Sequence, residues 1–216
     1  MSKVQVDTID TRSGTSTMQI GSTNTSTINL GVSGDTVNIP SGVTFANAGT
    51  ATGFGGITQS DMWIMTSNIT EDVGFITANW SRYTGPGGNI GSALTESSGV
   101  FSFPSTGFYK IDYIIGFRNQ SSDYAFTEVY CQLFYTQNDS AYTDATTSFI
   151  NVPAISSSNV YANGTGSAII DVTDTSQVKF KLKINAYAGA SQQNGIIIGS
   201  STGIATGFTC VRLADT

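Results

Sequence analysis

Alternation of apolar and polar side chains at every second position is the main pattern along this chain. It is strictest in residues 178–184, where Val, Phe, Leu and Ile alternate with three lysines. Residues 109–117 repeat it, with an apolar side chain at each odd-numbered position. Successive side chains of a strand point to opposite faces, so both segments predict strands with one buried face. No segment has a helical period over a useful length, and we therefore predict an all-β protein.

The segment 126–135 differs because it is apolar on both faces. One face carries Val129, Cys131 and Leu133, and the other carries Phe126, Tyr130 and Phe134. A strand of this kind is typical of burial on both sides. We expect the core of the domain on one side and another subunit on the other.

The first 45 residues contain a short repeat of the form apolar, amide, apolar. The copies are Val4-Gln5-Val6, Met18-Gln19-Ile20, Ile28-Asn29-Leu30 and Val37-Asn38-Ile39. Thr precedes each of the last three copies, at spacings of ten and nine residues, and Gly or Pro follows each of them. The pattern predicts short strands separated by turns. A disordered tail rich in Ser, Thr and Gly is the alternative.

Each repeat offers only two apolar side chains to one face, so a single chain cannot bury a core here. Repeat units of this kind need neighbours, and three chains around an axis would pair the exposed strand edges. We therefore predict a repetitive β stalk in residues 1–45, forming an intertwined trimer and anchoring the protein to its assembly. Its expected core residues are Val4, Val6, Met18, Ile20, Ile28, Leu30, Val37 and Ile39.

Beyond the stalk the composition changes twice. Residues 46–60 are dominated by glycine and small side chains and are interpreted as a neck. From residue 61 to 216, strand patterns recur between turn signals, as they do in sandwiches and barrels. We predict a single globular head over this range.

Charge narrows the function classes. Only 11% of the residues are charged and the net charge is −6, which argues against general nucleic-acid binding because phosphates need a basic surface. No apolar run approaches the roughly 18 residues of a membrane-spanning helix, so no membrane insertion is expected.

Catalytic chemistry lacks its usual residues. The chain contains no histidine, which removes the Ser-His-Asp triad, the Cys-His pair and the commonest metal ligand. Residues 199–203 match a nucleophile elbow formally, but that motif needs a helix and a histidine base, so we interpret them as a turn. Acids that could pair for glycoside hydrolysis show no selective spacing; they are Glu71, Asp72, Glu96, Asp123 and Glu128. We predict no enzyme activity and no cofactor.

Two further sets of residues allow alternative interpretations. Cys131 and Cys210 lie in apolar strand-like stretches and are interpreted as two buried free thiols, although a disulfide between them would also fit. Aromatic side chains near polar segments could stack on sugars, or could instead fill the core or a subunit interface. These candidate receptor contacts are Trp80, Tyr83, Tyr124, Tyr142 and Tyr161.

A family resemblance appears in residues 99–111. They read Gly-Val-Phe-Ser-Phe-Pro-Ser-Thr-Gly-Phe-Tyr-Lys-Ile and resemble the signature of the complement globular-head (C-one-q) family, related to the tumour-necrosis-factor jelly rolls. The signature is Gly-x-Phe-x-x-Pro-x-x-Gly-x-Tyr-x-Phe, and Ile111 stands at its last aromatic position. Residues 200–213 are similar to the family's closing strand, with Ala205 in place of a Phe.

The resemblance implies a jelly-roll sandwich of about ten strands that trimerises through an aromatic face. The aromatic side chains expected in the head core or the trimer interface are Phe101, Tyr109, Tyr113, Phe117, Tyr130, Phe134 and Phe208. Some members of the family bind calcium, for which residues 171–174 could offer oxygens. Because these residues lack the ligand density of a calcium loop, a turn is the interpretation that we prefer, and no metal site is predicted.

Residues 33–45 resemble the leading segments of bacteriophage fibre and appendage proteins. Together with the jelly-roll signature this resemblance implies a virion protein assembled in the host cytoplasm. The main hypothesis is a trimeric fibre whose N-terminus binds other virion proteins and whose head contacts a host-surface glycan or protein. The alternative is a capsid decoration or head-fibre protein with no receptor role.

Overall fold

The computed structural model describes residues 20–21, 23–46, 57–71, 73–85, 88–119, 125–154, 159–188, 191–192 and 195–216. No helix occurs among them, and so none that could cross a membrane. The chain divides into two compact units, Met1–Thr52 and Gly53–Thr216, which are described separately. The limits predicted for stalk, neck and head stay predictions.

The N-terminal unit, described over residues 20–46 apart from residue 22, has turns but no strand. Turns lie at residues 23–24, 33–34 and 41–42, close to the expected positions, and the main-chain N–H of Asp35 closes one by donating to Val32 O at 3.0 Å. The strands expected at residues 28–30 and 37–39 are not formed. A strand needs a hydrogen-bonded neighbour, and no described segment pairs with these residues as a strand. The predicted stalk residues Val4, Val6 and Met18 lie outside the described residues.

The second unit, the head, contains the fourteen strands found in the described residues. They are β1 (Ser60–Met65), β2 (Ile69–Glu71), β3 (Val73–Phe75), β4 (Trp80–Arg82), β5 (Thr95–Ser97), β6 (Val100–Ser102), β7 (Gly107–Asn119), β8 (Phe126–Thr136), β9 (Thr143–Val152), β10 (Tyr161–Val172), β11 (Lys179–Ala188), β12 (Ser191–Gln192), β13 (Gly195–Ile197) and β14 (Gly207–Ala214). All of their pairings are antiparallel.

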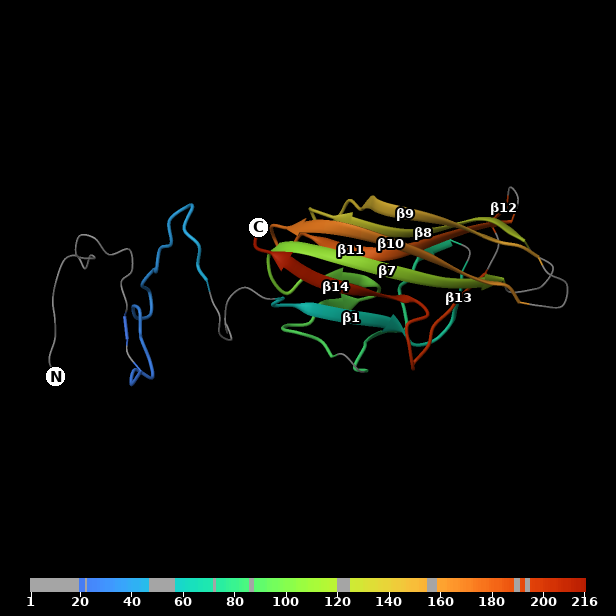
Figure 1. Cartoon of the computed structure of the whole chain (residues 1–216). Helices are drawn as coiled ribbons and strands as arrows, with labels where there is room; N and C mark the ends of the chain where they lie inside the picture. The colour runs from blue at the N-terminus through green and yellow to red at the C-terminus, as the bar shows by residue number, and fades with distance from the viewer. Residues whose placement is uncertain are drawn as a thin grey trace. The chain divides into compact units, whose positions relative to one another are not determined.

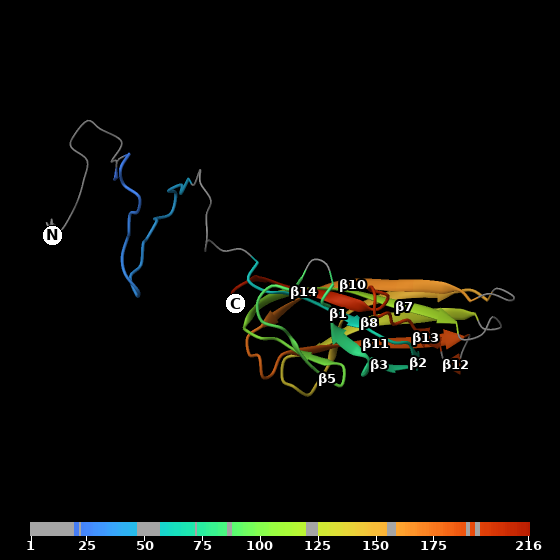
Figure 2. The same cartoon turned by 90° about the horizontal axis from the view of Figure 1, so that it is seen from below.

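The strands form two seven-stranded sheets packed face to face (Figures 1 and 2). In sheet A, β7 is flanked by β10 on one side and by β14 and β13 on the other, and β1 and β4 follow β14. In sheet B the order is β5-β6-β11-β8-β9, and β3 and β12 also pair with β11. The all-β prediction is therefore confirmed.

The two strictest alternating segments became central strands. The odd-numbered apolar side chains of β7 are buried, as are Val178, Phe180, Leu182, Ile184 and Ala186. Because β11 has paired neighbours on both sides, its three lysines stand over the middle of sheet B.

The segment predicted to be apolar on both faces forms β8. One of its residues, Phe126, lies on the opposite face from the one predicted. Phe126 was expected beside Tyr130 and Phe134, but it is fully buried in the core, with its ring centroid 5.0 Å from that of Phe117. The pairing with β9 shifts between Phe126 and Val129, which marks a β-bulge. An extra residue in a bulge moves the following side chains to the opposite face, and period-two reasoning does not foresee it.

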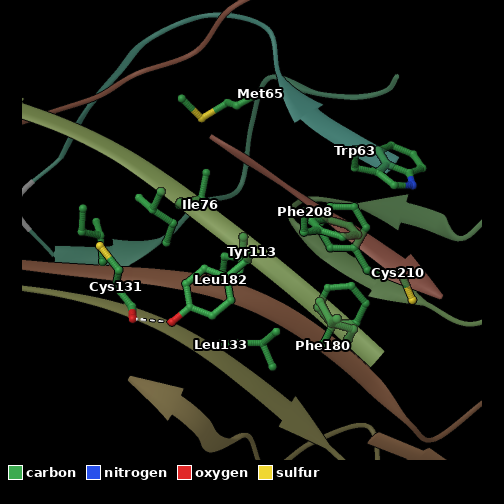
Figure 3. Close-up of a cluster of buried hydrophobic side chains, with 14 of the residues drawn as sticks. Trp63, Met65, Ile76, Tyr113, Cys131, Leu133, Phe180, Leu182, Phe208 and Cys210 are labelled. Carbon is green, nitrogen blue, oxygen red and sulfur yellow. Dashed lines mark hydrogen bonds between the residues drawn. The ribbon is translucent and has the colours of Figure 1, made fainter. Parts of the chain in front are cut away.

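A dense aromatic cluster fills one end of the core (Figure 3). Phe101 stacks on Phe180 with ring centroids 5.2 Å apart, and Phe208 meets Phe101 edge-on at 4.6 Å. These rings come from both sheets. Cys131 and Cys210 are buried free thiols, which confirms the preferred interpretation of the two cysteines.

The buried carboxylate of Asp61 on β1 links this strand to β4 and to the segment before β5. The Asp61 side chain is fully buried, and Arg82 Nε donates to its Oδ1 at 2.5 Å. Trp63 Nε1 and the main-chain N–H of Leu94 donate to Oδ2 at 3.0 and 2.7 Å. A carboxylate can be buried at acceptable cost only when it is paired and hydrogen-bonded in this way.

Candidate interaction surfaces

The outward face of sheet A is the first candidate surface, and we call it the flat face. It carries the side chains of β7, β10, β14 and β1 that point away from the core. In register across it, Ile114 pairs with Thr165, Asp112 with Ser167 and Lys110 with Ile169. Ile169 is 64% exposed.

A shallow hollow of about 500 Å³ lies on the flat face. It is lined mainly by Asp112, Ile114, Thr165, Ser167, Ile204 and Thr209. The apolar part includes Ile204, an exposed loop residue. A hollow in a sheet face, lined by isoleucine and hydroxyl side chains, is suited to receive a protruding apolar side chain.

The flat face has one ion pair. Lys110 Nζ donates to Asp112 Oδ2 at 2.8 Å, and both side chains remain nearly half exposed. Partial burial acts to raise the pKa of Asp112, but hydrogen bonds from Lys110 and Ser167 and the charge of Lys110 outweigh it, so the pKa is lowered. The ionised carboxylate is thus already neutralised by its own chain.

Exposed apolar side chains also stand on the two strands where the edges of the sheets meet. β10 at the edge of sheet A lies against β9 at the edge of sheet B (Figure 1). Phe149 on β9 is 67% exposed and packs beside Tyr130 on the outward side of sheet B. Tyr161 and Ile169 on β10 are 63% and 64% exposed and share their side of the strand with Thr165, so they point outward on the flat face. We call Tyr161 and Ile169 the edge residues; they offer apolar projections on the same face as the hollow.

The outward face of sheet B is the second candidate surface, and we call it the outer face. At one end Tyr130 lies between Phe149 and Tyr187, with ring centroids 4.9 and 5.9 Å away. Phe134 lies farther along β8, with its ring edge-on to Phe75 at 5.5 Å. The half-buried side of β8, expected to meet another subunit, is therefore covered in part by rings of the same chain.

Polar groups separate the two aromatic ends of the outer face. Asn185 Nδ2 donates to Gln132 Oε1 at 3.0 Å. Gln132 Nε2 donates in turn to Asp144 Oδ2 at 2.7 Å and to Thr147 Oγ1 at 3.0 Å. This row fixes the orientation of two planar amides across three strands.

Lysines lie over the second aromatic group. Lys181 Nζ is 3.6 Å from the centroid of the Phe75 ring and 3.7 Å from that of Tyr142. Lys183 Nζ is 5.4 Å from the Phe134 centroid. Desolvation, assisted by the charge of Lys183, lowers the pKa of Lys181. Cation–π attraction holds both ammonium groups at this surface.

The structure separates the candidate receptor contacts. Trp80 packs against the core and donates from Nε1 to Ile76 O at 2.8 Å, and Tyr83 is half-buried near the end of β4. Tyr142 lies on the outer face and Tyr161 on the flat face. Tyr124 lies outside the described residues. The four described side chains therefore do not share one site.

The aromatic side chains predicted for the core or the interface fall into two groups. Five are buried in the core, and these are Phe101, Tyr109, Tyr113, Phe117 and Phe208. Tyr130 and Phe134 are half-buried on the outer face. Sequence reasoning missed Phe149 and Ile169, although both stand in alternating segments, because β9 and β10 are rich in Thr, Ser, Gly and Asn.

Glu96 and Glu128, the acids considered for glycoside hydrolysis whose side chains the structure describes, have structural partners. Glu96 accepts a hydrogen bond from the main-chain N–H of Gly99 at 2.7 Å, and Glu128 accepts one from the Tyr130 hydroxyl. The turn expected at residues 171–174 lies a few residues later: Asp171 and Val172 end β10, and Asp174 accepts from Ser176 N at 2.8 Å at the start of the turn at residues 175–177. Asp72 and Asp123 lie outside the described residues, as does the side chain of Glu71. Within the described part of the chain, no three His, Cys, Asp or Glu residues cluster as a metal site would require.

Residues 199–203 form a loop of bends between β13 and β14, with no helix after it. Gly199 N donates to Asn68 Oδ1 at 2.9 Å, and Thr202 N donates to Ser200 Oγ at 3.3 Å. The interpretation as a turn is confirmed, and the segment does not have the strand-to-helix geometry of a nucleophile elbow.

Comparison with known proteins yields a match in structure only. No protein-family model and no curated protein sequence matches the chain. Murine APRIL at pH 5.0 matches with 13% identity and a TM-score of 0.50, over 72% of this chain and 98% of that one. Eiger TNF from S. frugiperda matches with 11% identity and a TM-score of 0.49, over 73% of this chain and 93% of that one. At these identities the likeness shows the fold alone. The head is a jelly roll of the tumour-necrosis-factor type, as predicted.

Proposed function

We propose that this chain is a structural, non-enzymatic protein of a bacteriophage particle. In this proposal it is a homotrimeric fibre whose N-terminal stalk joins other virion proteins and whose jelly-roll head contacts the host surface. The observation that carries the proposal is the exposure of every large apolar side chain in the described part of the stalk, from Ile20 to Phe45. They range from 43% exposed at Ile39 to 78% at Val32.

The exposed apolar side chains of the stalk favour association of several copies. Removing apolar surface from water stabilises by about 25 cal/mol per Å². The described stalk residues have no core of their own in which to gain that energy, while their turns recur at nearly regular spacing. Association of several copies in register would bury these side chains and supply hydrogen-bonded neighbours to the extended segments.

The head supports association independently of the stalk. The flat face carries both the hollow and the edge residues Tyr161 and Ile169, so a contact in which an edge residue of one copy enters the hollow of the next joins unlike patches of two copies. Such heterologous contacts form a closed ring when the rotation between copies closes. Three copies are the number implied by the resemblance of residues 99–111 to the complement globular-head signature. The phage context rests on the resemblance of residues 33–45 to fibre proteins.

Mass photometry of the full-length chain tests the trimer. We expect particles with three times the mass of one chain, and a monomer would contradict the proposal. Leu30→Asp in the stalk and Ile169→Asp at an edge residue of the head should each increase the dissociated fraction. Ser97→Asp, at an exposed side chain of β5 in sheet B, lies outside both apolar surfaces and is the control for an added negative charge.

The virion role requires a separate experiment. Gold-labelled antibody against the head should decorate particles that assemble with the full-length chain. Particles assembled with a chain lacking residues 1–55 should carry no label. Label that persists on the truncated protein would show that the anchor is elsewhere. Host-cell binding by the purified trimer would separate a receptor-binding fibre from a decoration protein.

A further inference from the structure

The outer face concentrates positive charge on an acidic protein. The chain has nine Lys and Arg against fifteen Asp and Glu, yet Lys179, Lys181 and Lys183 stand on one face of β11. Lys179 is paired with Asp139, with Nζ 2.5 Å from Oδ1. Neither of the other two lysines forms an ion pair or a hydrogen bond with another described residue.

The position of Lys181 leaves its charge available to a ligand. Its ammonium group lies between the Phe75 and Tyr142 rings, which attract a cation but accept no strong hydrogen bond. An ammonium group has three N–H donors. Those of Lys181 have no carboxylate acceptor among the described residues, and their partial removal from water is reflected in the lowered pKa.

An aromatic platform stands across the same sheet. Phe149 is 67% exposed and is held edge-on by Tyr130. Neighbouring strands lie about 4.8 Å apart, so the step from β9 across β8 to β11 places Phe149 roughly 10 Å from Asn185, the residue in register with it. Lys183 and Lys181 follow two and four residues along β11, roughly 12 and 16 Å from Phe149. The amides of Gln132 and Asn185 lie between Phe149 and these lysines, held by hydrogen bonds. A flat ring, fixed amides and two uncompensated cations thus follow one another along one surface.

We propose that the outer face binds an acidic oligosaccharide. A sugar ring stacks on Phe149, hydroxyl groups bond to the amide row, and a carboxylate pairs with Lys181 and Lys183. This inference rests on the proposed function in that it names the ligand of the host-contacting head. The outer face lies on the opposite side of the sandwich from the flat face, so trimerisation through the flat face leaves it accessible.

Other ligand classes fit the surface less well. A neutral glycan would leave two ammonium groups without a counter-charge in the contact. A nucleic acid would bring closely spaced phosphates against a chain of net charge −6, which opposes binding. A sugar acid carries few charges per ring and has the apolar ring faces that an aromatic side chain can cover.

Surface plasmon resonance with the full-length protein provides the test. The immobilised probes are polygalacturonate, a sulfated dextran and neutral dextran, at 0.15 M salt. We expect binding to polygalacturonate and none to neutral dextran. Lys181→Met and Lys183→Met should each weaken binding at least tenfold, because Met keeps the apolar stem against the rings and removes the charge. Phe149→Ala should weaken binding by a similar factor.

Lys179→Met is the matched control. It lies on the same strand face and changes the net charge equally, but its charge is already paired, so we expect a change below threefold. Equal loss in all three lysine variants, with Phe149→Ala unaffected, would show unspecific charge attraction and overturn the inference. Absence of binding to polygalacturonate would also overturn it. Mass photometry of the same samples reports the trimer separately, so failure of the glycan site is distinguishable from failure of the proposed assembly.

Discussion

The hydroxyl of Tyr113 on β7 donates a 2.6 Å hydrogen bond to the main-chain carbonyl oxygen of Cys131 on β8, and this bond joins the two sheets through the core (Figure 3). Tyr113 is 3% exposed and Cys131 is fully buried. Burial raises the pKa of Tyr113 to about 12, so the phenol stays protonated and remains a donor at neutral pH.

Tyr113→Phe removes this bond and little else. We expect a loss of about 1–2 kcal/mol in the free energy of unfolding, because the Cys131 carbonyl loses a buried donor. Urea unfolding followed by tryptophan fluorescence measures the loss. Tyr83→Phe, at a half-buried tyrosine near the end of β4, serves as the control. An unchanged unfolding midpoint for Tyr113→Phe would mean that the bond contributes nothing to stability.

Glycines in β10 create the space that the Tyr113–Cys131 contact occupies. A Cβ placed on Gly164 would lie 2.5 Å from Cys131 Sγ, and one placed on Gly166 would lie 2.6 Å from the Tyr113 ring. Gly164→Ala should therefore cost about 1–3 kcal/mol, as overpacking of a core does. Gly203→Ala is the control, since its Cβ would meet nothing within 4 Å. Thermal melting by circular dichroism compares the two, and equal midpoints would contradict the close approach.

The sequence predicts the central strands well and the surfaces poorly, for a physical reason. Strands β7 and β11 alternate without interruption, because each has one face in a continuous core. The inward positions of β10 include Gly164 and Gly166, which have no side chain. The apolar residues that identify this segment as a strand therefore include Ile169, which points outward. Glycines that make room for a larger residue on another strand cannot be recognised from their own segment.

The N-terminal repeat shows a second limit of sequence reasoning. Apolar residues such as Ile28 and Leu30 indicate which side chains need burial, but both are exposed in the described part of the chain. The alternating pattern predicts strands, while the described part of the repeat forms turns without strands. The turn positions depend on local Gly and Pro and are predicted within a few residues. A strand also needs a hydrogen-bonded neighbour, which the pattern of one segment does not identify.

The Asp61 network predicts a large loss from a single polar substitution. Asp61→Ala leaves Arg82, Trp63 and the Leu94 N–H without their shared acceptor, and breaking a buried pair of this kind costs about 3 kcal/mol or more. Asp215→Ala breaks the pair with Arg212 at a carboxylate that is 90% exposed, and should leave the unfolding midpoint unchanged. Chemical unfolding of both variants provides the comparison. Similar midpoints for the two would contradict the role assigned to Asp61.

The two thiols should be unreactive in the folded protein. Burial raises the pKa of Cys131 to about 12, and burial, with the charge of Asp61, raises the pKa of Cys210. Since the thiolate is the reactive form, we expect no reaction with Ellman's reagent at pH 8 under native conditions. In guanidinium chloride, without reductant, both thiols of each chain should react. Failure to react after unfolding would indicate a disulfide.

The Lys110–Asp112 pair predicts a pH dependence with a defined sign. The pKa of Asp112 is lowered from its ordinary 3.8, so folding favours the ionised carboxylate. The resulting stabilisation is present above pH 3.8 and is lost as the pH falls through the lower folded-state value. Asp112→Asn should therefore be less stable than the natural chain at pH 6, and the difference should shrink toward pH 3 in urea unfolding.

In a Lys110→Met background the same substitution should have a smaller effect at pH 6, because the lysine that favours the carboxylate is gone. A difference that grows on acidification would contradict the assigned sign.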